Sequence, residues 1–165
     1  MEKDFNRDAE KLRKVSLCFI QQDGKILLAM KKRGFGAGLW NGYGGKQKPG
    51  ESIEETAIRE TNEEIGIKIN KMEHVATINF FFDDEPADAN LNQKVFVYMI
   101  KDYAGSPTES EEMKPEWFDI KDIPYSRMWA DDKYWLPKVL EGKKLNATFV
   151  FGKGNFVKEA EVREL

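Results

Sequence analysis

The feature that most constrains the fold of this chain is a glycine-rich segment that leads into a well-marked helix. Residues 34–45 hold six glycines in twelve positions, which is too many for a regular helix or strand. Glycine lets a backbone approach a ligand closely, and binding residues are concentrated on loops. We therefore expect a functional loop at this position.

The helix that follows is marked at both ends. Ser52 stands three residues before Glu55, which is the pattern of a capping box. Gly66 tolerates the positive φ that is common just past a helix. Apolar residues recur at helical spacing on one predicted side, namely Ile53, Ala57 and Ile58. The segment between Ser52 and Gly66 is the clearest helix in the chain.

The remaining pattern predicts strands interleaved with one more helix. A first hairpin joins residues 15–20 to residues 26–30 through a turn at Asp23-Gly24. Further strands are predicted at residues 75–82, 95–100 and 116–120, and a closing hairpin at residues 147–165. A second helix is predicted at residues 135–140, with Pro137 in its first turn. This order favours an α/β (α+β) fold with helices packed on a mixed sheet.

Length and composition limit the classes of protein that remain. A chain of 165 residues with 41% hydrophobic residues fits one globular domain, with no linker that would divide it. The charged start and the absence of a long apolar run predict a cytoplasmic protein with no membrane partner. A formal net charge of -3 argues against binding of long nucleic acid but allows a small nucleotide. The single Cys18 is expected to be a buried core residue.

The predicted helix carries five glutamates, and three of them share a face. Glu60, Glu63 and Glu64 are three or four residues apart, so their like charges destabilise the helix unless something compensates them. One explanation is a solvated charged surface. The other is a hard divalent cation such as Mg²⁺, which takes carboxylate and phosphate oxygens as ligands.

The segment at residues 45–67, GKQKPGESIEETAIRETNEEIGI, resembles the Nudix box, Gx5Ex7REUxEExGU, where U is a bulky aliphatic residue. The matching identities are Gly45, Glu51, Arg59, Glu60, Glu63, Glu64, Gly66 and Ile67. Eight identities at fixed spacing make this a specific signal. Thr61 departs from the pattern, and we expect it to face the core. The resemblance implies a Nudix-type α/β/α sandwich with a mixed β-sheet.

The resemblance also implies roles for the acidic helix. Glu51 is expected to pair with Arg59 and to orient the helix. Metal ligands are implied at the carbonyl of Gly44 and at the side chains of Glu60, Glu63 and Glu64. Any one of these glutamates could instead act as the general base or as electrostatic support. With Mg²⁺, or Mn²⁺ in its place, the implied reaction is attack of water on a phosphoanhydride bond, with a glutamate accepting the proton.

Three segments outside the box, at residues 30–46, 110–120 and 128–135, look like the branch of this family that hydrolyses oxidised purine nucleoside triphosphates. The similarity extends over residues 14–165, which we take as one Nudix hydrolase domain. Residues 1–13 lie outside it and are expected to form a polar extension. The implied reaction converts 8-oxo-dGTP, 2-hydroxy-dATP and related compounds to the monophosphate and pyrophosphate. We expect the protein to be a monomer.

The similarity to this branch implies a nucleotide-binding site. Hydrogen bonds to the purine are implied for Asn41, Asp131 and Asp132, and stacking for Trp129. The other residues expected to line the site are Ser16, Lys31, Phe35, Tyr43, Gly44, Gly45, Lys46, Phe80 and Ala130. Glu112 matches an additional metal ligand. Without the resemblance, the two aspartates would be interpreted as a helix N-cap and Trp129 as an ordinary core or surface aromatic residue.

Three positions depart from this branch. Leu39 stands where arginine is frequent, Tyr43 replaces phenylalanine, and Ala130 stands where proline is frequent. We expect Ala130 to loosen the loop that presents the aspartates. Two other functions stay open: a Nudix pyrophosphohydrolase for another nucleoside diphosphate derivative, and a nucleotide-sensing Nudix domain without catalysis.

Overall fold

A computed structural model describes residues 11–86 and 91–165 of the chain. Its strands are β1 (Arg13–Gln22), β2 (Lys25–Lys31), β3 (Trp40–Asn41), β4 (Lys68–Phe82), β5 (Gln93–Ala104), β6 (Met113–Asp119), β7 (Leu145–Phe151) and β8 (Val157–Glu164). Its helices are α1 (Ile53–Ile65) and α2 (Asp132–Leu140), with short 3-10 helices at Ile120–Asp122 and Tyr125–Arg127. Of the expected extension at residues 1–13, residues 1–10 lie outside the described part of the chain, and Arg13 begins β1.

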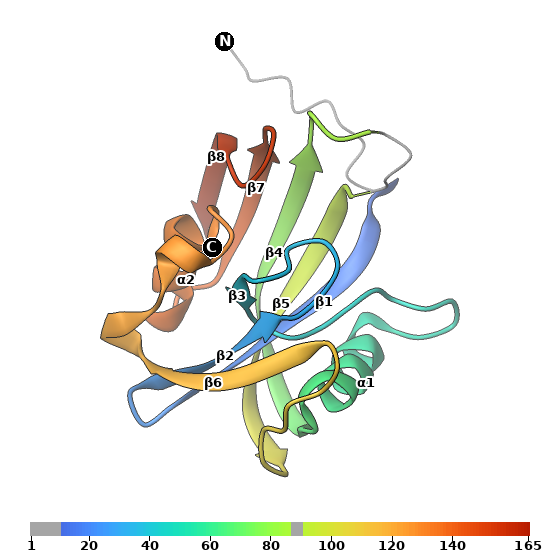
Figure 1. Ribbon diagram of the computed structural model, residues 1–165, viewed down its shortest axis with the longest axis vertical. Helices are drawn as coiled ribbons and strands as arrows, with labels where there is room; N and C mark the ends of the chain where they lie inside the picture. Colours follow the sequence, from blue (N-terminus) through green and yellow to red (C-terminus); the bar gives the residue numbers. More distant parts are fainter. Residues whose placement is uncertain (1–10, 87–90) are drawn as a thin grey trace.

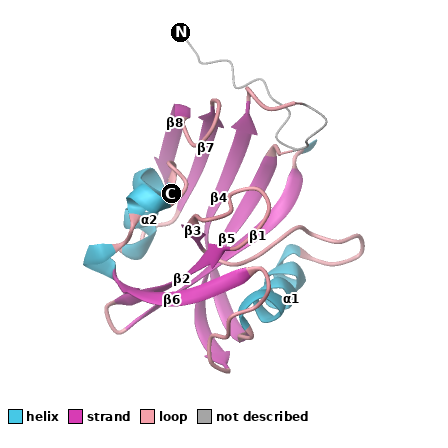
Figure 2. Cartoon of the chain, in the orientation of Figure 1, coloured by secondary structure: helices cyan, strands magenta, loops and turns pink. Residues whose placement is uncertain are grey.

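The strands form one mixed sheet, as the interleaved pattern predicted. Its order is β3-β2-β1-β5-β4-β7-β8, and β6 pairs with β2 beside this path. The pairs β1–β5 and β4–β7 are parallel, whereas the other pairs are antiparallel. Figure 1 shows the two helices at opposite ends of this sheet, and Figure 2 shows how much of the chain is strand.

Alternation along the strands gives the sheet two apolar faces. In β2, Ile26 and Leu28 belong to one buried cluster, and Leu27 and Ala29 belong to the other. Successive side chains of a strand point to opposite faces, so a fully apolar strand needs cover on both sides. Helix α2 covers the first face through Trp135, and α1 covers the second. The result is a sheet between two helical layers, which confirms the expected fold class.

Helix α1 has the predicted boundaries. The Ser52 side chain accepts a hydrogen bond from the Glu55 amide, and the Glu55 side chain accepts one from the Ser52 amide. Gly66 ends the helix with a φ of 72°, in the left-handed region. Thr61 is fully buried, as expected, whereas Ile58 is exposed and not on the packed side.

Helix α2 differs from the prediction at its start. It begins at Asp132, three residues before the predicted start at Trp135. Pro137 therefore lies in the second turn, where proline removes a backbone donor. The helix tolerates this because Trp135, Leu136 and Val139 are buried in the first cluster. Tertiary packing has extended the helix toward the paired aspartates.

The other predicted elements are present with longer boundaries. β4 and β5 extend beyond residues 75–82 and 95–100, and β7 and β8 form the closing hairpin. Cys18 is buried, as predicted, and burial raises the pKa of its thiol to about 12. His74 is exposed, and its Nε2 lies 2.9 Å from the Thr77 hydroxyl. No helix in the described ranges is long and apolar enough to cross a membrane.

The capping box gives a test of what anchors α1. Ser52→Ala should lower the free energy of unfolding by about 1 kcal/mol, because the Glu55 amide at the start of the helix loses its side-chain acceptor. Urea unfolding of both proteins measures the difference. Ser126→Ala, at an exposed serine, is the control and should change stability by less than about 0.5 kcal/mol. Equal stability of Ser52→Ala and the parent chain would contradict this role.

Candidate functional site

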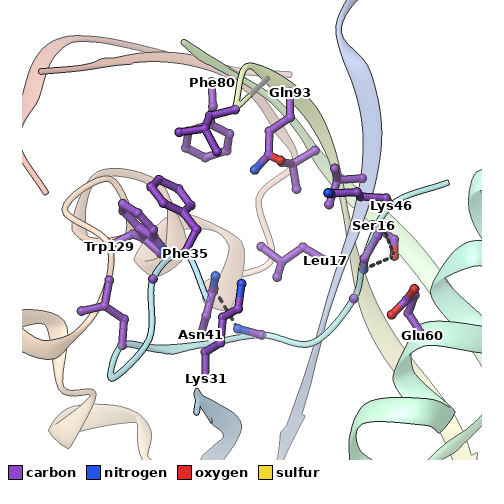
Figure 3. A pocket seen from close by; sticks show the side chains of 18 of the residues that line it. Ser16, Leu17, Lys31, Phe35, Asn41, Lys46, Glu60, Phe80, Gln93 and Trp129 are labelled. Atoms are coloured by element: carbon purple, nitrogen blue, oxygen red, sulfur yellow. Dashed lines mark hydrogen bonds between the residues drawn. The ribbon is translucent and has the colours of Figure 1, made fainter. Parts of the chain in front are cut away.

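A cavity of about 540 Å³ lies between the glycine-rich segment, β4, β5 and the loop before α2. One end is acidic, with Glu60, Glu64 and Glu112, and the other is aromatic, with Phe35 and Trp129 among its walls. Figure 3 shows Trp129 and Phe35 together on one side and Glu60 on the helix at the other. A ligand with a charged end and an apolar end would fit this division.

Glycines form the floor between the acidic helix and β1. The Ser16 amide donates to the Gly45 carbonyl at 2.9 Å, and Cys18 and Tyr43 exchange two backbone hydrogen bonds. A Cβ at Gly44 would lie 2.0 Å from the Ser16 carbonyl oxygen, and one at Gly45 would lie 2.4 Å from the Glu60 carboxyl carbon. Gly44 requires glycine because a side chain there would collide with the backbone of β1, whereas a side chain at Gly45 would displace the Glu60 carboxylate.

Glu51 and Arg59 form the predicted pair. Arg59 donates to Glu51 from Nη2 at 2.7 Å and from Nε at 3.0 Å, which is a bidentate arrangement. Glu51 also accepts from the Lys48 amide and the Thr56 hydroxyl. The hydrogen bonds from Arg59 and then from Lys48 lower the pKa of Glu51 to about 2. This ionised carboxylate ties the loop before α1 to the helix.

Arg59 also contacts two of the three clustered glutamates. Its Nη1 lies 2.8 Å from Glu60 Oε1 and 3.3 Å from Glu63 Oε2. Glu64 is oriented differently, because its Oε2 accepts from the Gly44 amide at 3.2 Å. Burial raises the pKa of Glu64 to about 8, opposed by the Gly44 amide and reinforced by the charges of Glu60 and Glu112. Glu60 pairs with Arg59 and Glu112 pairs with Arg33, so Glu64 is the carboxyl at the acidic end whose charged form a bound cation would favour.

This arrangement fits a divalent cation without forming a complete site. In the described part of the chain, no three acidic, histidine or cysteine side chains converge as a ready metal site. The Gly44 amide faces Glu64, and in an extended chain the carbonyl of the same residue points to the same side. The Gly44 carbonyl, Glu60 and Glu64 could thus supply hard oxygen ligands to a divalent cation such as Mg²⁺ or Mn²⁺.

Aromatic rings build the other end of the cavity. Trp129 lies 5.0 Å from Phe35, 6.2 Å from Phe82 and 5.7 Å from Phe151, measured between ring centroids. Phe35 is 44% exposed, so it stands at the mouth. Asn41 lies between the two ends, where its Oδ1 accepts from the Gly42 amide at 2.8 Å. The cavity can hold a flat aromatic ring beside an amide group.

Asp131 and Asp132 lie in the wall of this aromatic end and are both 2% exposed. Asp131 occupies the N-cap position of α2 but makes no side-chain cap; its Oδ2 accepts from Trp135 Nε1 at 2.8 Å. The capping interpretation is therefore wrong for its side chain. Burial raises the pKa of Asp131 to about 6, and burial together with the neighbouring Asp131 charge raises the pKa of Asp132 well above its usual range. The pair therefore favours a state in which one carboxyl carries a proton.

Most predicted site residues line this one cavity. Those that do are Ser16, Lys31, Phe35, Asn41, Gly44, Gly45, Lys46, Glu60, Glu64, Phe80, Glu112, Trp129, Asp131 and Asp132. Four do not line it, and one of these is Arg59, which contacts Glu51, Glu60 and Glu63 instead. Tyr43 is buried in the core beneath the glycine floor, Glu63 is about half exposed and pairs with Arg59, and Ala130 packs against the first apolar cluster. Tyr43 is placed in the core because its strand alternates, so its ring points away from the cavity.

Several lining residues were not predicted. Phe82 lies two residues after Phe80 and so shares its face of β4, a relation that strand alternation could have indicated. Arg13, Gln93 and Phe151 also line the cavity. They come from three separate strands, and only the pairing of β1 with β5 and of β4 with β7 brings them to one place. No local pattern signals that convergence.

Comparison with known proteins gives consistent matches. The family model described as NUDIX domain matches residues 10–139. The chain is 42% identical to oxidized purine nucleoside triphosphate hydrolase of Danio rerio, over 92% of this chain and 94% of that protein. It is 40% identical to the protein of the same name from Mus musculus, over 91% and 94%. The solved Mutator MutT protein from Bacillus halodurans is similar with a TM-score of 0.79 and 28% identity, over 92% of this chain and 97% of that one.

The buried aspartate pair predicts how stability depends on pH. A carboxyl whose pKa is raised by folding holds more protons in the folded state, so its contribution is complete near pH 4 and declines as the pH rises through the folded value. Because the folded pKa of Asp131 is about 6 and that of Asp132 is also raised, the parent chain should lose stability as the pH rises from about 4 through 6 and above. Asp132→Asn should reduce that loss, because an amide stays neutral and can donate to Asp131.

Thermal unfolding at a series of pH values from 5 to 8 measures this effect. The melting temperature of Asp132→Asn should exceed that of the parent by a growing margin as the pH rises. Asp122→Asn, at an exposed aspartate, is the matched control and should follow the parent. Parallel curves for Asp132→Asn and the parent would show that Asp132 is ionised in the folded protein.

Proposed function

The chain belongs to the NUDIX domain family, and we propose that it hydrolyses oxidised purine nucleoside triphosphates such as 8-oxo-dGTP and 2-hydroxy-dATP to the monophosphate and pyrophosphate. Such a reaction removes damaged precursors from the nucleotide pool. The similarity to relatives named for this activity, over more than nine-tenths of the chain, supports the assignment.

The observation that carries the proposal is the division of one cavity into two chemically different ends. A buried carboxyl pair and the four rings of Phe35, Phe82, Trp129 and Phe151 stand at one end, and the glutamates of α1 with the glycine floor stand at the other. A purine triphosphate has the same division, with a flat polar base and a polyanionic chain. A ligand that binds by charge alone would leave the aromatic end unused.

The base end suits an oxidised purine because its two carboxyls differ. Asp131 accepts from Trp135, and burial raises the pKa of Asp132, so we take Asp132 as the protonated member of a pair that offers both an acceptor and a donor to a ring edge. The Oδ2 atom of Asp132 is buried and has no hydrogen-bond partner among the described residues. Asn41 adds an amide, and Trp129 offers a surface for stacking. These groups are the ones we assign to base recognition.

The acidic end performs the chemistry. A bound divalent cation, Mg²⁺ or Mn²⁺, neutralises the phosphate oxygens and makes an attacking water more nucleophilic. Glu60 and Glu64 with the Gly44 carbonyl are the groups that would hold it, and Glu112 could add a further oxygen. Arg59 orients Glu60 and Glu63 while Glu51 holds Arg59 in place. One of the glutamates that is free of the cation accepts the proton of the water.

Lys31 lines the cavity beside these glutamates, and its charge acts on Glu64. Together with Lys46 it supplies cationic groups for the phosphate chain. We further propose that the protein acts as a monomer, because one chain supplies every group named above. We also propose that it acts in the cytoplasm, as its sequence predicted.

A panel of nucleotides tests the proposed substrate. The parent chain should hydrolyse 8-oxo-dGTP and 2-hydroxy-dATP with a kcat/KM at least about tenfold above that for dGTP, since one good hydrogen-bonded contact is worth about 1.4 kcal/mol. Pyrophosphate, and no orthophosphate, should be released. Preference for ADP-ribose or nucleotide sugars would identify another Nudix pyrophosphohydrolase, and binding without turnover would identify a sensing domain.

The role of the acidic helix is tested by Glu64→Gln. The amide keeps the volume of the side chain but loses a charge near the cation, so turnover should fall by about 10² or more. Activity of the parent should also disappear in excess chelator and return with Mg²⁺. Glu55→Gln on the same helix is the control, because glutamine also completes a capping box. Full activity of Glu64→Gln would remove Glu64 from the reaction.

A further inference from the structure

Asn155, in the turn between β7 and β8, lies outside the cavity yet is bonded to the segment that presents the base-binding groups. Its Oδ1 accepts from the Ala130 amide at 2.7 Å, and its Nδ2 donates to the Met128 carbonyl at 2.9 Å. We propose that Asn155 is a positioning residue that sets Trp129, and with it the aspartate pair, for purine recognition. The inference rests on the proposed function.

The two hydrogen bonds act on either side of Trp129. An amide side chain carries one acceptor and one donor, so it can pair with residues 128 and 130 as a neighbouring strand would. Met128 also forms a backbone bridge with Trp40, and its side chain is buried. The backbone of Trp129 is thereby fixed at both neighbours. This backbone cannot turn away from the cavity without breaking one of these contacts, and the rings of Phe35, Phe82 and Phe151 pack around the Trp129 ring itself.

The turn that carries Asn155 is itself well defined. Gly154 has a φ of 74°, which lies in the left-handed region that favours glycine. The Gly152 amide donates to the Phe156 carbonyl at 2.8 Å and closes the turn. Phe151, at the end of β7, packs against Trp129 with ring centroids 5.7 Å apart. The closing hairpin therefore supports the base-binding segment through both a ring and an amide.

The hydrogen bond to Asn155 explains why position 130 is alanine and not proline. The Asp132 amide donates to the Trp129 carbonyl at 3.1 Å, so Ala130 is the second residue of a turn. Proline suits that position of a turn, but it has no N–H to donate to Asn155. The expectation that Ala130 loosens the loop is wrong in this respect. Here an N–H bonded to Asn155 replaces the rigidity that a proline ring would provide.

The expected consequence is an effect on binding rather than on the chemical step. Asn155 is not among the residues that line the cavity, so it does not touch the substrate, and the glutamates of α1 are far along the chain from residue 155. Loss of its hydrogen bonds should leave the base-binding segment folded but less ordered. The affinity for purines should fall, and kcat should stay close to that of the parent.

The test uses Asn155→Ala, Asn155→Asp and the control Lys153→Ala, which truncates an exposed side chain in the same turn. In Asn155→Ala, KM for 8-oxo-dGTP should rise about three- to tenfold, as expected for the loss of one or two hydrogen bonds, with kcat changed less than about twofold. Asn155→Asp should be no better, because a carboxylate can accept from Ala130 but cannot donate to the Met128 carbonyl. Lys153→Ala should match the parent.

A rescue variant separates positioning from general stability. In the Asn155→Ala background, Ala130→Pro should restore KM toward the parent value, because the ring restricts the turn without needing an acceptor. In the parent background the same substitution should give no such gain. Thermal unfolding of all variants verifies that the fold is retained, and a loss of affinity that follows melting temperature alone, without rescue by proline, would overturn the proposal.

Hydrogen exchange tests the contact without any substrate. The Ala130 amide should exchange about three- to tenfold faster in Asn155→Ala than in the parent or in Lys153→Ala, since it loses its acceptor. Equal exchange rates would overturn the proposal. If the parent hydrolyses no oxidised purine, the proposed function fails, and affinity for whichever purine nucleotide binds still decides whether Asn155 positions the segment.

Discussion

The close approach of residues 42–45 to β1 on one side and to α1 on the other is the constraint on which the site depends. Two backbone layers and a carboxylate meet where a Cβ at Gly44 or Gly45 would lie within 2.4 Å of another atom. That approach places the Gly44 amide against Glu64 and, with the Glu51–Arg59 pair, determines where the glutamates of α1 lie. The cavity continues from this floor toward the aromatic end.

The two ends of the cavity use burial in different ways. At the acidic end, burial and the charges of Glu60 and Glu112 raise the pKa of Glu64 to about 8, so a divalent cation would be needed to favour its ionised form. At the base end, burial raises the pKa of both Asp131 and Asp132, which favours a proton shared between the two carboxyls. The acidic end is therefore suited to a polyanion with a divalent metal, and the base end is suited to an uncharged ring edge.

The closing hairpin has a part in both stability and recognition. β7 pairs with β4 and carries Phe151 beneath Trp129, while the turn after it supplies Asn155. The base-binding segment is irregular, and irregular segments keep a defined shape only when side chains satisfy their backbone groups. The hairpin supplies these partners, so the last twenty residues contribute to a site whose catalytic groups lie about ninety residues earlier in the chain.

The sequence by itself determined what local spacing encodes. The limits of α1, the Glu51–Arg59 pair, the first and last hairpins and the family followed from residues that are close in the chain, because capping, helical periodicity and motif spacing are local. The tertiary structure decided the rest. Gln93 and Phe151 line the cavity, whereas Tyr43 is buried in the core. The Asp131 side chain accepts from Trp135 and does not cap the helix, and Asn155 accepts from the Ala130 amide. These outcomes depend on strand pairing and burial between distant segments, which no local pattern specifies.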